Sequence, residues 1–587
     1  METYEIHPTH FPTHFSTRFR HLNLTMRRIC KLQHSLFIKH IVLVLSIFTL
    51  AGCASLPQTL VLPVQAESLL KPDYYTVDIP SFDGETIRAT LYQPALKPHE
   101  TAPLIIHAHG FGMFRMSSPN SLYARFIFSG ITARKAWEQG YWVLSIDHRG
   151  HGGSGGRINM MDPNIEVKDL SWTLDWAERN IPRLTYDKDK PVVGMLGESY
   201  GGGLQLLAAS LDDRIKAIVP ITTWYDFSNV LVPNNVVKTG WLTTLVGMGN
   251  LMNPMTMNRD LTSSYFKALV SEVPSHFAPM MSSRSLSTAC YCTSQSIPHA
   301  DAFFIQGFRD VLFPVNEAIE NMNCLKASGR DVRLLATQKG HLLPMTQFAM
   351  SLPGYDIDNK VTCDGQERRT DEMVLAWFDE KLKGQKHKAD IVPKMCLTHD
   401  DQSGTTFEAI PYGGREFTFK SAKVGSGFAG LFELPLNLVD WIGSSFTLKH
   451  NESGGDITAE YRDNRTGLLR PVFVPLYRVD ENTTIAGIPT AQFNISGDNE
   501  DIIFASIGVK RNGAVSTEII SDQVYPFRGG QVHTVELPAI STQLRRGDRL
   551  GLVFAGYSNQ YRLSSHITSR ASISGRVRLP IQGLNVD

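Results

Sequence analysis

Residues 192–203 read VVGMLGESYGGG, an apolar run of strand length that leads into the pattern G-x-S-x-G. The next six residues, LQLLAA, are good helix formers. A strand, a sharp turn and a helix in this order lift a serine clear of the sheet. Such a tight turn needs small residues two positions before and after the serine, and these are Gly197 and Gly201. The stretch predicts an exposed nucleophile, Ser199; the alternative is a glycine-rich turn with a chance serine.

Strand and helix patterns alternate on both sides of this stretch, which predicts a doubly wound α/β domain over residues 73–390. A hairpin with Asp83-Gly84 at its turn opens the domain. The rhythm breaks at about 240–298, where we expect an insertion. Strand patterns occupy 103–108, 141–146, 215–221, 302–306 and 332–336, and helical patterns occupy 124–139, 169–180 and 315–327.

Two polar residues after later strands complete a candidate triad. Asp310 ends a G-x-x-D motif, and His341 follows the next strand in Gly340-His341. Because carboxyl ends of parallel strands share one edge, we expect Ser199, Asp310 and His341 to meet there. His341 would accept the serine proton, and Asp310 would orient the imidazole. Asp226, which follows the preceding strand, is the rival for the acid.

Two backbone N–H groups are candidates for an oxyanion hole. Tyr200 opens the helix after the serine, where an N–H group stabilises negative charge. Phe111 lies in His109-Gly110-Phe111-Gly112, directly after the strand at 103–108. The alternative for this second loop is a plain connection from strand to helix. A third loop, 147–155, has the sequence DHRGHGGSG, and we interpret it as a structural turn rather than a catalytic or metal site.

The N-terminus has the order of a targeting segment. Cations from Met26-Arg27-Arg28 to Lys39 precede an apolar run at 41–50, which is too short to span a bilayer comfortably. The following LAGC sequence ends at Cys53 and resembles the lipobox of bacterial lipoproteins. We expect an N-terminal extension and signal peptide at 1–52, with Met26 as the true start, and a linker at 53–72. Acylated Cys53 would anchor the chain to the outer membrane of a bacterial envelope; the alternatives are an uncleaved anchor and an ordinary signal peptide.

Composition limits the remaining possibilities. A length of 587 residues predicts two or three domains. Lys plus Arg and Asp plus Glu both number 57, so no overall basic field argues for a nucleic-acid partner. Five cysteines follow Cys53, and an exported location permits disulfides among them. These are Cys290, Cys292, Cys324, Cys363 and Cys396, whose pairing the sequence leaves open.

Residues 400–587 change character from helical to alternating patterns. Stretches such as 501–509 and 549–554 alternate apolar and polar residues between Gly, Pro, Asn and Asp turns. Many short strands with regular turns predict a sandwich or jelly roll. No Ser, His and Asp order is evident there, so we expect packing or recognition from this domain.

Together, GESYGG at 197–202, G-x-x-D at 307–310, Gly340-His341 and the β domain resemble the Xaa-Pro dipeptidyl-peptidase and cocaine-esterase family. The resemblance implies an α/β-hydrolase domain with a cap at the insertion, followed by a jelly-roll (galactose-binding-like) domain. It implies a serine nucleophile, no metal and no cofactor. The substrate would be a small molecule or short peptide, cleaved at an ester or amide bond.

Three functions remain in view. The first is a serine hydrolase that cleaves an ester or peptide-like amide, and the second is an Xaa-Pro dipeptidyl-peptidase proper. That family usually has a tyrosine in its oxyanion loop, whereas residues 109–115 read HGFGMFR. The difference favours a hole built from backbone N–H groups. The third is a non-enzymatic surface binding protein, against which an intact triad argues.

Overall fold

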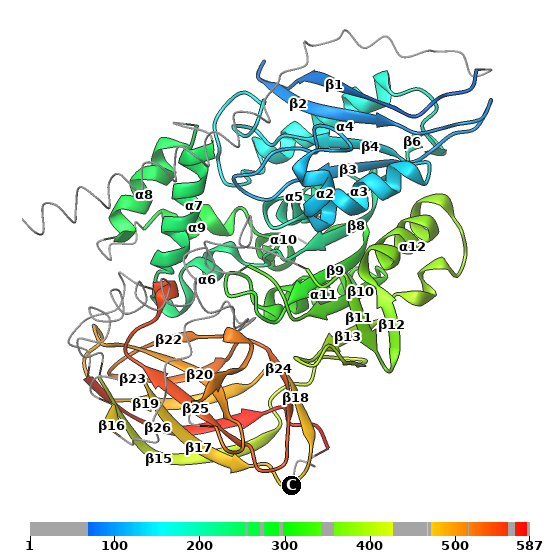
Figure 1. Ribbon diagram of the computed structural model, residues 1–587. Coiled ribbons are helices and arrows are strands. Elements are labelled where there is room, and N and C mark those ends of the chain that lie inside the picture. Colours follow the sequence, from blue (N-terminus) through cyan, green and yellow to red (C-terminus); the bar gives the residue numbers. More distant parts are fainter. Residues whose placement is uncertain are drawn as a thin grey trace, which may run out of the picture. The chain divides into compact units, whose positions relative to one another are not determined.

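The computed structural model describes residues 68–252, 256–269, 275–292, 297–341, 357–425, 466–467, 471–514, 516–561 and 570–583. The expected signal segment 1–52, Cys53 and most of the linker 53–72 lie outside these described residues. One large mixed sheet is flanked by helices, and smaller antiparallel sheets follow it in the chain (Figure 1). Within the described ranges, none of the helices is long and apolar enough to cross a membrane.

The large sheet is parallel in its centre and antiparallel at its edges. This confirms the expected α/β class. Two short hairpins accompany it: β5 (Tyr186–Asp187) with β6 (Lys190–Pro191), and β11 (Lys360–Cys363) with β12 (Gln366–Arg369). Across the sheet the order is β1 (Asp73–Pro80), β2 (Thr86–Gln93), β4 (Trp142–Ile146), β3 (Leu104–Ala108), β7 (Val193–Glu198), β8 (Ile215–Ile221), β9 (Asp301–Gly307), β10 (Val332–Thr337), β13 (Met395–Thr398) and β14 (Gly404–Thr406).

Helices bury both faces of this sheet. In β3, Leu104 and Ile106 join one core with apolar residues of α4, α5 and α11, whereas Ile105 joins a second core with residues of α3 and α12. Two-sided burial explains why the central strands are continuous apolar runs in the sequence. The helices are α2 (Leu122–Phe126), α3 (Phe128–Glu138), α4 (Glu166–Asn180), α5 (Tyr200–Leu211), α11 (Val315–Ala327) and α12 (Thr370–Lys383).

The segment between β8 and β9 is helical. Buried Arg284 fastens it to the loop before α4: its Nε donates to the carbonyl oxygen of Asn159 at 2.9 Å, and Nη2 pairs with Asp162 at 3.0 Å. A disulfide between Cys290 and Cys324 joins α10 to α11. The helices are α6 (Phe227–Leu231), α7 (Thr239–Met252), α8 (Arg259–Leu269), α9 (Phe277–Ser282) and α10 (Leu286–Cys292).

The large sheet extends past the expected end of the hydrolase domain at residue 390. Strand β13 pairs in parallel with β10, and β14 returns against β13 as far as Thr406. A second disulfide, Cys363–Cys396, ties β11 to β13. These strands are short, and no long helix separates them from the following β region. The sequence pattern therefore placed them outside the α/β domain.

Two largely antiparallel sheets, with β15 and β16 as a parallel pair, and a separate strand pair form the C-terminal region, in accord with the expected β domain. Their facing side chains, Phe493, Phe527 and Phe554 among them, form one apolar core. One sheet contains β16 (Thr466–Gly467), β15 (Arg415–Gly425), β26 (Arg570–Leu579), β19 (Thr490–Ile495) and β23 (Gln531–Glu536). The second sheet contains β17 (Val472–Arg478), β25 (Arg549–Ala555), β20 (Ile502–Lys510), β21 (Glu518–Ile519) and β22 (Tyr525–Arg528). The strand pair consists of β18 (Thr483–Gly487) and β24 (Ile540–Leu544).

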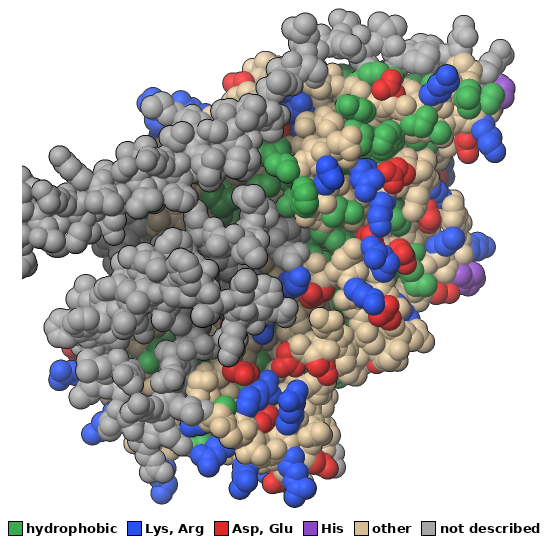
Figure 2. Space-filling view, viewed as in Figure 1, with side chains coloured by type: hydrophobic (Ala, Val, Ile, Leu, Met, Phe, Trp, Pro, Cys, Tyr) green, Lys and Arg blue, Asp and Glu red, His purple; other side chains and the backbone are tan. Residues whose placement is uncertain are grey.

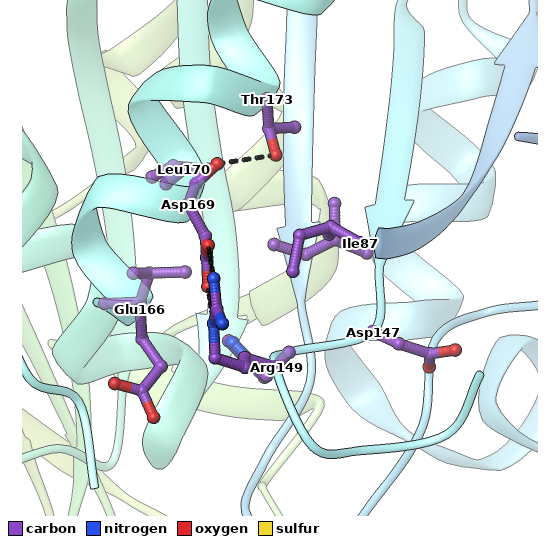
Figure 3. A pocket seen from close by; sticks show the side chains of 10 residues that line it. Ile87, Asp147, Arg149, Glu166, Asp169, Leu170 and Thr173 are labelled. Carbon is purple, nitrogen blue, oxygen red and sulfur yellow. Dashed lines mark hydrogen bonds and ion pairs between the residues drawn. The ribbon is translucent and has the colours of Figure 1, made fainter. Parts of the chain in front are cut away.

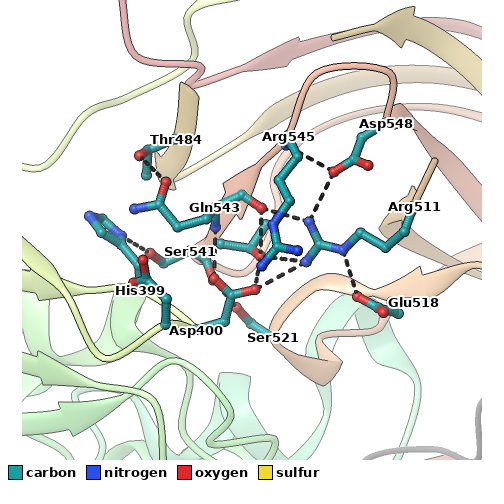
Figure 4. Close-up of polar contacts among 12 residues, drawn as sticks. His399, Asp400, Thr484, Arg511, Glu518, Ser521, Ser541, Gln543, Arg545 and Asp548 are labelled. Carbon is teal, nitrogen blue, oxygen red and sulfur yellow. Dashed lines mark hydrogen bonds and ion pairs between the residues drawn. The ribbon is translucent and has the colours of Figure 1, made fainter. Parts of the chain in front are cut away.

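Arg511 is the centre of a polar network between the end of the large sheet and the β domain (Figure 4). Its guanidinium pairs with Asp400 at 3.0 Å, Glu518 at 3.1 Å and the buried Asp548 at 3.1 Å. Asp400 lies between β13 and β14, the last two strands of the large sheet, whereas Glu518 and Asp548 belong to the β domain. The network therefore joins the two regions. One planar cation thus holds three carboxylates from three segments together.

Acidic and basic side chains are interspersed on the surface that Figure 2 presents. Lys and Arg alternate with Asp and Glu there, and no single-sign patch dominates the described surface in this view. This agrees with the zero net charge of the sequence.

We expect Arg511→Leu to lower the free energy of unfolding by about 3 kcal/mol, because it leaves the buried Asp548 carboxylate without its cation. Urea denaturation followed by fluorescence would measure the loss. The control is Arg546→Leu, which removes an exposed arginine from the neighbouring turn. Equal midpoints for the two variants would contradict the assigned role of Arg511.

Candidate active site

Ser199 is at the turn between β7 and α5, in a backbone conformation that side chains rarely adopt (φ 53°, ψ −112°). A Cβ atom on either Gly197 or Gly201 would lie 2.1 Å from the carbonyl oxygen of Ala108. Only glycine fits at these two positions. The Ser199 N–H donates to the carbonyl oxygen of Ile221 at 2.8 Å, which fixes the turn against β8. Ser199 is partly exposed, whereas its two neighbours are buried.

The structure brings Asp310 and His341 into contact. His341 Nδ1 lies 2.7 Å from Asp310 Oδ2, and Asp310 is fully buried. The other carboxylate oxygen accepts the N–H groups of Leu312 at 3.1 Å and Phe313 at 2.7 Å. With its Nδ1 proton committed to Asp310, the imidazole keeps Nε2 as the atom that can accept a proton.

Two glycines allow the Asp310 and His341 loops to approach each other. A Cβ atom on Gly307 would lie 1.2 Å from the carbonyl oxygen of Lys339, and one on Gly340 would lie 2.6 Å from Cβ of Asp310. The Val311 N–H also donates to the carbonyl oxygen of His341 at 3.3 Å. The glycines of the G-x-x-D and Gly-His motifs are therefore required by sterics.

Asp226, the rival acid, has a different partner. Its side chain caps helix α6 by accepting the Asn229 N–H at 3.1 Å. Its own N–H donates to buried Glu317 at 2.9 Å. Asp226 thus supports the start of the helical insertion, while Asp310 is the carboxylate on His341.

The loop after β3 is held with one peptide group in a defined orientation. The His148 N–H donates to His109 Nε2 at 3.1 Å, so the His109 proton is on Nδ1, which donates to the Gly110 carbonyl oxygen at 2.7 Å. Because C=O and N–H of a trans peptide point in opposite directions, this fixes the Phe111 N–H on the other side. Among the described residues, the N–H groups of Phe111 and Tyr200 donate to no other group.

Three buried histidines pack behind this loop as neutral rings. Burial lowers the pKa of His109 well below its usual value, that of His148 to about 3 and that of His151 to about 4. His151 packs edge-on against Phe111, with ring centroids 5.4 Å apart. In the described ranges, no group of three or more His, Cys, Asp or Glu residues is arranged to hold a metal ion. The histidines shape the loop.

Figure 3 shows a small cavity behind the loop at 147–155. Arg149 pairs there with Asp83 at 2.7 Å and with Asp169 at 2.6 Å, which joins the loop to the first hairpin and to α4. The lining includes Glu166 but neither Ser199 nor His341. The cavity belongs to the structural support of the loop and is separate from the candidate triad.

Two residues that the sequence did not indicate hold the Asp310 loop. Lys238, at the start of the helical insertion, donates to the carbonyl oxygens of Val311 at 3.0 Å and Leu312 at 3.1 Å. Gln523, from the β domain, donates to those of Phe308 at 2.6 Å and Asp310 at 3.0 Å. Neither residue lies in a motif. Only the packing of the insertion and the β domain brings them to this loop.

Residues 83–343 match the family described as X-Pro dipeptidyl-peptidase (S15 family). This confirms the resemblance that the motifs indicated. Among curated relatives, an uncharacterised protein of Pseudomonas aeruginosa is 30% identical over 25% of this chain and 36% of its own length. The quorum-quenching protein AidA of Acinetobacter baumannii is 26% identical over 27% of this chain and 48% of its own. The chain thus spans about a third to a half of the length of these relatives.

Solved structures extend the likeness over both regions of the chain. An aminopeptidase from the marine sediment archaeon Thaumarchaeota archaeon has a TM-score of 0.56 at 12% identity, covering 90% of this chain and 99% of that one. A CocE/NonD family hydrolase from Staphylococcus aureus has a TM-score of 0.55 at 12% identity, covering 87% and 94%. An alpha-amino acid ester hydrolase has a TM-score of 0.55 at 13% identity, covering 89% and 98%. These likenesses confirm the fold.

We expect Gln523→Met to lower the free energy of unfolding by about 2 kcal/mol, because it leaves two buried carbonyl oxygens without their donor. Chemical denaturation would measure the change. Gln531→Met, which replaces an exposed glutamine of the same domain, is the matched control. If both variants have the same denaturation midpoint as the parent protein, the contact of Gln523 with the Asp310 loop contributes nothing to stability.

Acid should destabilise the fold through the buried histidines. Folding lowers the pKa of His151 from 6.5 to about 4, so its contribution to stability is complete above pH 6.5 and is lost as pH falls towards 4. Between pH 7 and pH 4, we expect the parent protein to lose up to about 3 kcal/mol more of its free energy of unfolding than His151→Phe loses. Denaturation midpoints at stepped pH would show this. An equal effect of His387→Phe, which removes an exposed histidine, would disprove the assignment.

Proposed function

We propose that this chain, whose residues 83–343 match the X-Pro dipeptidyl-peptidase (S15) family, is a serine hydrolase that cleaves an ester or peptide-like amide bond. The observation that carries the proposal is the 2.7 Å contact between His341 Nδ1 and Asp310. This pair follows β9 and β10, at the same edge of the sheet as the strained Ser199 turn after β7. A buried acid, an oriented imidazole and a partly exposed serine in this order support acyl transfer.

In the proposed mechanism, Ser199 Oγ attacks the carbonyl carbon while His341 Nε2 accepts its proton. Asp310 stabilises the imidazolium that forms. The N–H groups of Tyr200 and Phe111 bind the developing oxyanion, at about 3 kcal/mol for each donor. His341 then protonates the leaving group, and an acyl-enzyme remains on Ser199. Water activated by His341 hydrolyses this ester and restores the serine.

The composition of the helical insertion favours a substrate with an apolar group. Helix α7 reads TGWLTTLVGMGNLM and has no charged residue. A Cβ atom on Gly112 of the oxyanion loop would lie 3.3 Å from Cβ of Met248 in α7, and the ring of Trp241 lies 6.1 Å from that of His341. An apolar cover suits an ester with an apolar acyl group. The second candidate, Xaa-Pro dipeptidyl-peptidase, rests on the family description and would need carboxylates for the free α-amine.

We also propose that the chain acts in a bacterial envelope, anchored by lipid on Cys53. The lipobox-like LAGC sequence carries this proposal. The two disulfides, Cys290–Cys324 and Cys363–Cys396, support it because such bonds persist in oxidising compartments. Mass spectrometry of the mature N-terminus would test it: an unlipidated chain that begins upstream of Cys53 would rule it out.

Labelling with a fluorophosphonate probe tests the nucleophile. We expect the parent protein to be labelled and Ser199→Ala to remain unlabelled, because the probe reacts only with an activated serine. Ser210→Ala, which changes a serine at the far end of α5, is the control and should label normally. A panel of p-nitrophenyl esters and Xaa-Pro-nitroanilides then separates esterase from peptidase. No labelling of a folded parent protein would contradict the proposed hydrolase.

A further inference from the structure

Glu198, directly before the nucleophile, is a buried carboxyl group outside the triad. It is 2% exposed at the end of β7. Its Oε1 accepts the Gly110 N–H at 3.2 Å, whereas its Oε2 is buried without a hydrogen-bond partner among the described residues. An ionised carboxylate with a single long hydrogen bond would be very costly in such a place. The site therefore favours the neutral acid.

Among the residues that the structure describes, the groups around Glu198 offer it no compensating charge. On α2, the Tyr123 hydroxyl oxygen accepts the same Gly110 N–H at 3.3 Å. On the loops, His109 and His148 are neutral because burial lowers the pKa of both imidazoles. Of the other titratable groups in the candidate site, His341 and Asp310 bond to each other, and burial raises the pKa of the Tyr200 hydroxyl well above its usual value. Burial raises the pKa of Glu198 from 4.5 to about 8, and no cation counteracts this effect.

Glu198 also lies against the candidate oxyanion loop, beside Ser199. A Cβ atom on Gly110 would be 3.7 Å from Glu198 Oε1 and 3.7 Å from Cβ of Ser199. The Gly110 residue is held from two sides, by Glu198 at its N–H and by His109 at its carbonyl oxygen. The orientation of the following Phe111 N–H depends on both contacts.

We propose that Glu198 is a positioning residue that works as a neutral acid: protonated, it holds Gly110 and hence the Phe111 N–H, and ionised, it slows the reaction at Ser199. The inference rests on the proposed hydrolase function. Loss of the Glu198 proton to solvent would put a negative charge behind the position where the oxyanion develops. For two like unit charges about 8 Å apart at an effective dielectric constant of about 20, the repulsion corresponds to a roughly 30-fold slower reaction.

The test is the pH dependence of the second-order rate constant for fluorophosphonate labelling, from about pH 5 to about pH 10. The reactivity of the parent protein should fall roughly 30-fold as the pH rises through pH 8 or so. Glu198→Gln keeps an oxygen that can accept the Gly110 N–H but cannot ionise, so its reactivity should stay high at alkaline pH. Glu317→Gln is the matched control, because it removes another buried carboxyl group with a raised pKa. It should keep the alkaline fall.

The outcomes separate the two proposals. No labelling of the parent protein at any pH overturns the hydrolase function and the inference together. Labelling that stays constant up to about pH 10, or an alkaline fall that persists in Glu198→Gln, overturns the inference alone. If Glu198→Gln does not fold, a parent profile without an alkaline fall still overturns the inference, and the stability measurement below tests it on the Glu198→Ala variant instead.

Stability gives a readout that does not depend on activity. Since folding raises the pKa of Glu198 from 4.5 to about 8, the parent protein loses stability as pH rises through this range. The stability of Glu198→Gln relative to the parent protein should therefore be higher at pH 8 than at pH 5. A pH-independent difference would mean that Glu198 is ionised in the folded protein and would overturn the inference.

Discussion

The candidate site depends on one steric contact, between the carbonyl oxygen of Ala108 and the two glycines at positions 197 and 201. Any side chain at either glycine would overlap that oxygen. The contact sets the Ser199 turn directly beside the end of β3. Because residues 109–112 continue from that strand, the loop with the Phe111 N–H lies next to Ser199. The proposed nucleophile and the proposed oxyanion loop are thus brought together by the same pairing of β3 with β7.

Buried neutral groups surround this contact. His109 and His148 fix the Gly110 carbonyl oxygen, and Glu198 accepts the Gly110 N–H. A site that must stabilise a developing negative charge gains from a low dielectric environment without other anions. Burial creates that environment and, at the same time, keeps the histidines and the glutamic acid uncharged. Packing and electrostatics therefore act in the same direction around Ser199.

The acid loop depends on three regions of the chain. Asp310 itself follows β9, while Lys238 from the helical insertion and Gln523 from the β domain bond to the backbone of its loop. The β domain thus has a physical connection to the candidate site, beyond the packing or recognition expected from its sequence. Arg511 supports the same boundary from another side by pairing with Asp400.

Sequence alone determined the features that depend on local sterics and periodicity. The glycines around Ser199, Asp310 and His341 are readable because a tight turn excludes side chains at fixed spacing, and alternating apolar patterns identified the α/β and β regions. Tertiary structure decided the rest: the pairing of the cysteines, the extension of the large sheet to Thr406, the contacts of Gln523 and Lys238, and the burial of Glu198. These depend on residues far apart in the chain, and no local pattern encodes which distant surfaces will pack together.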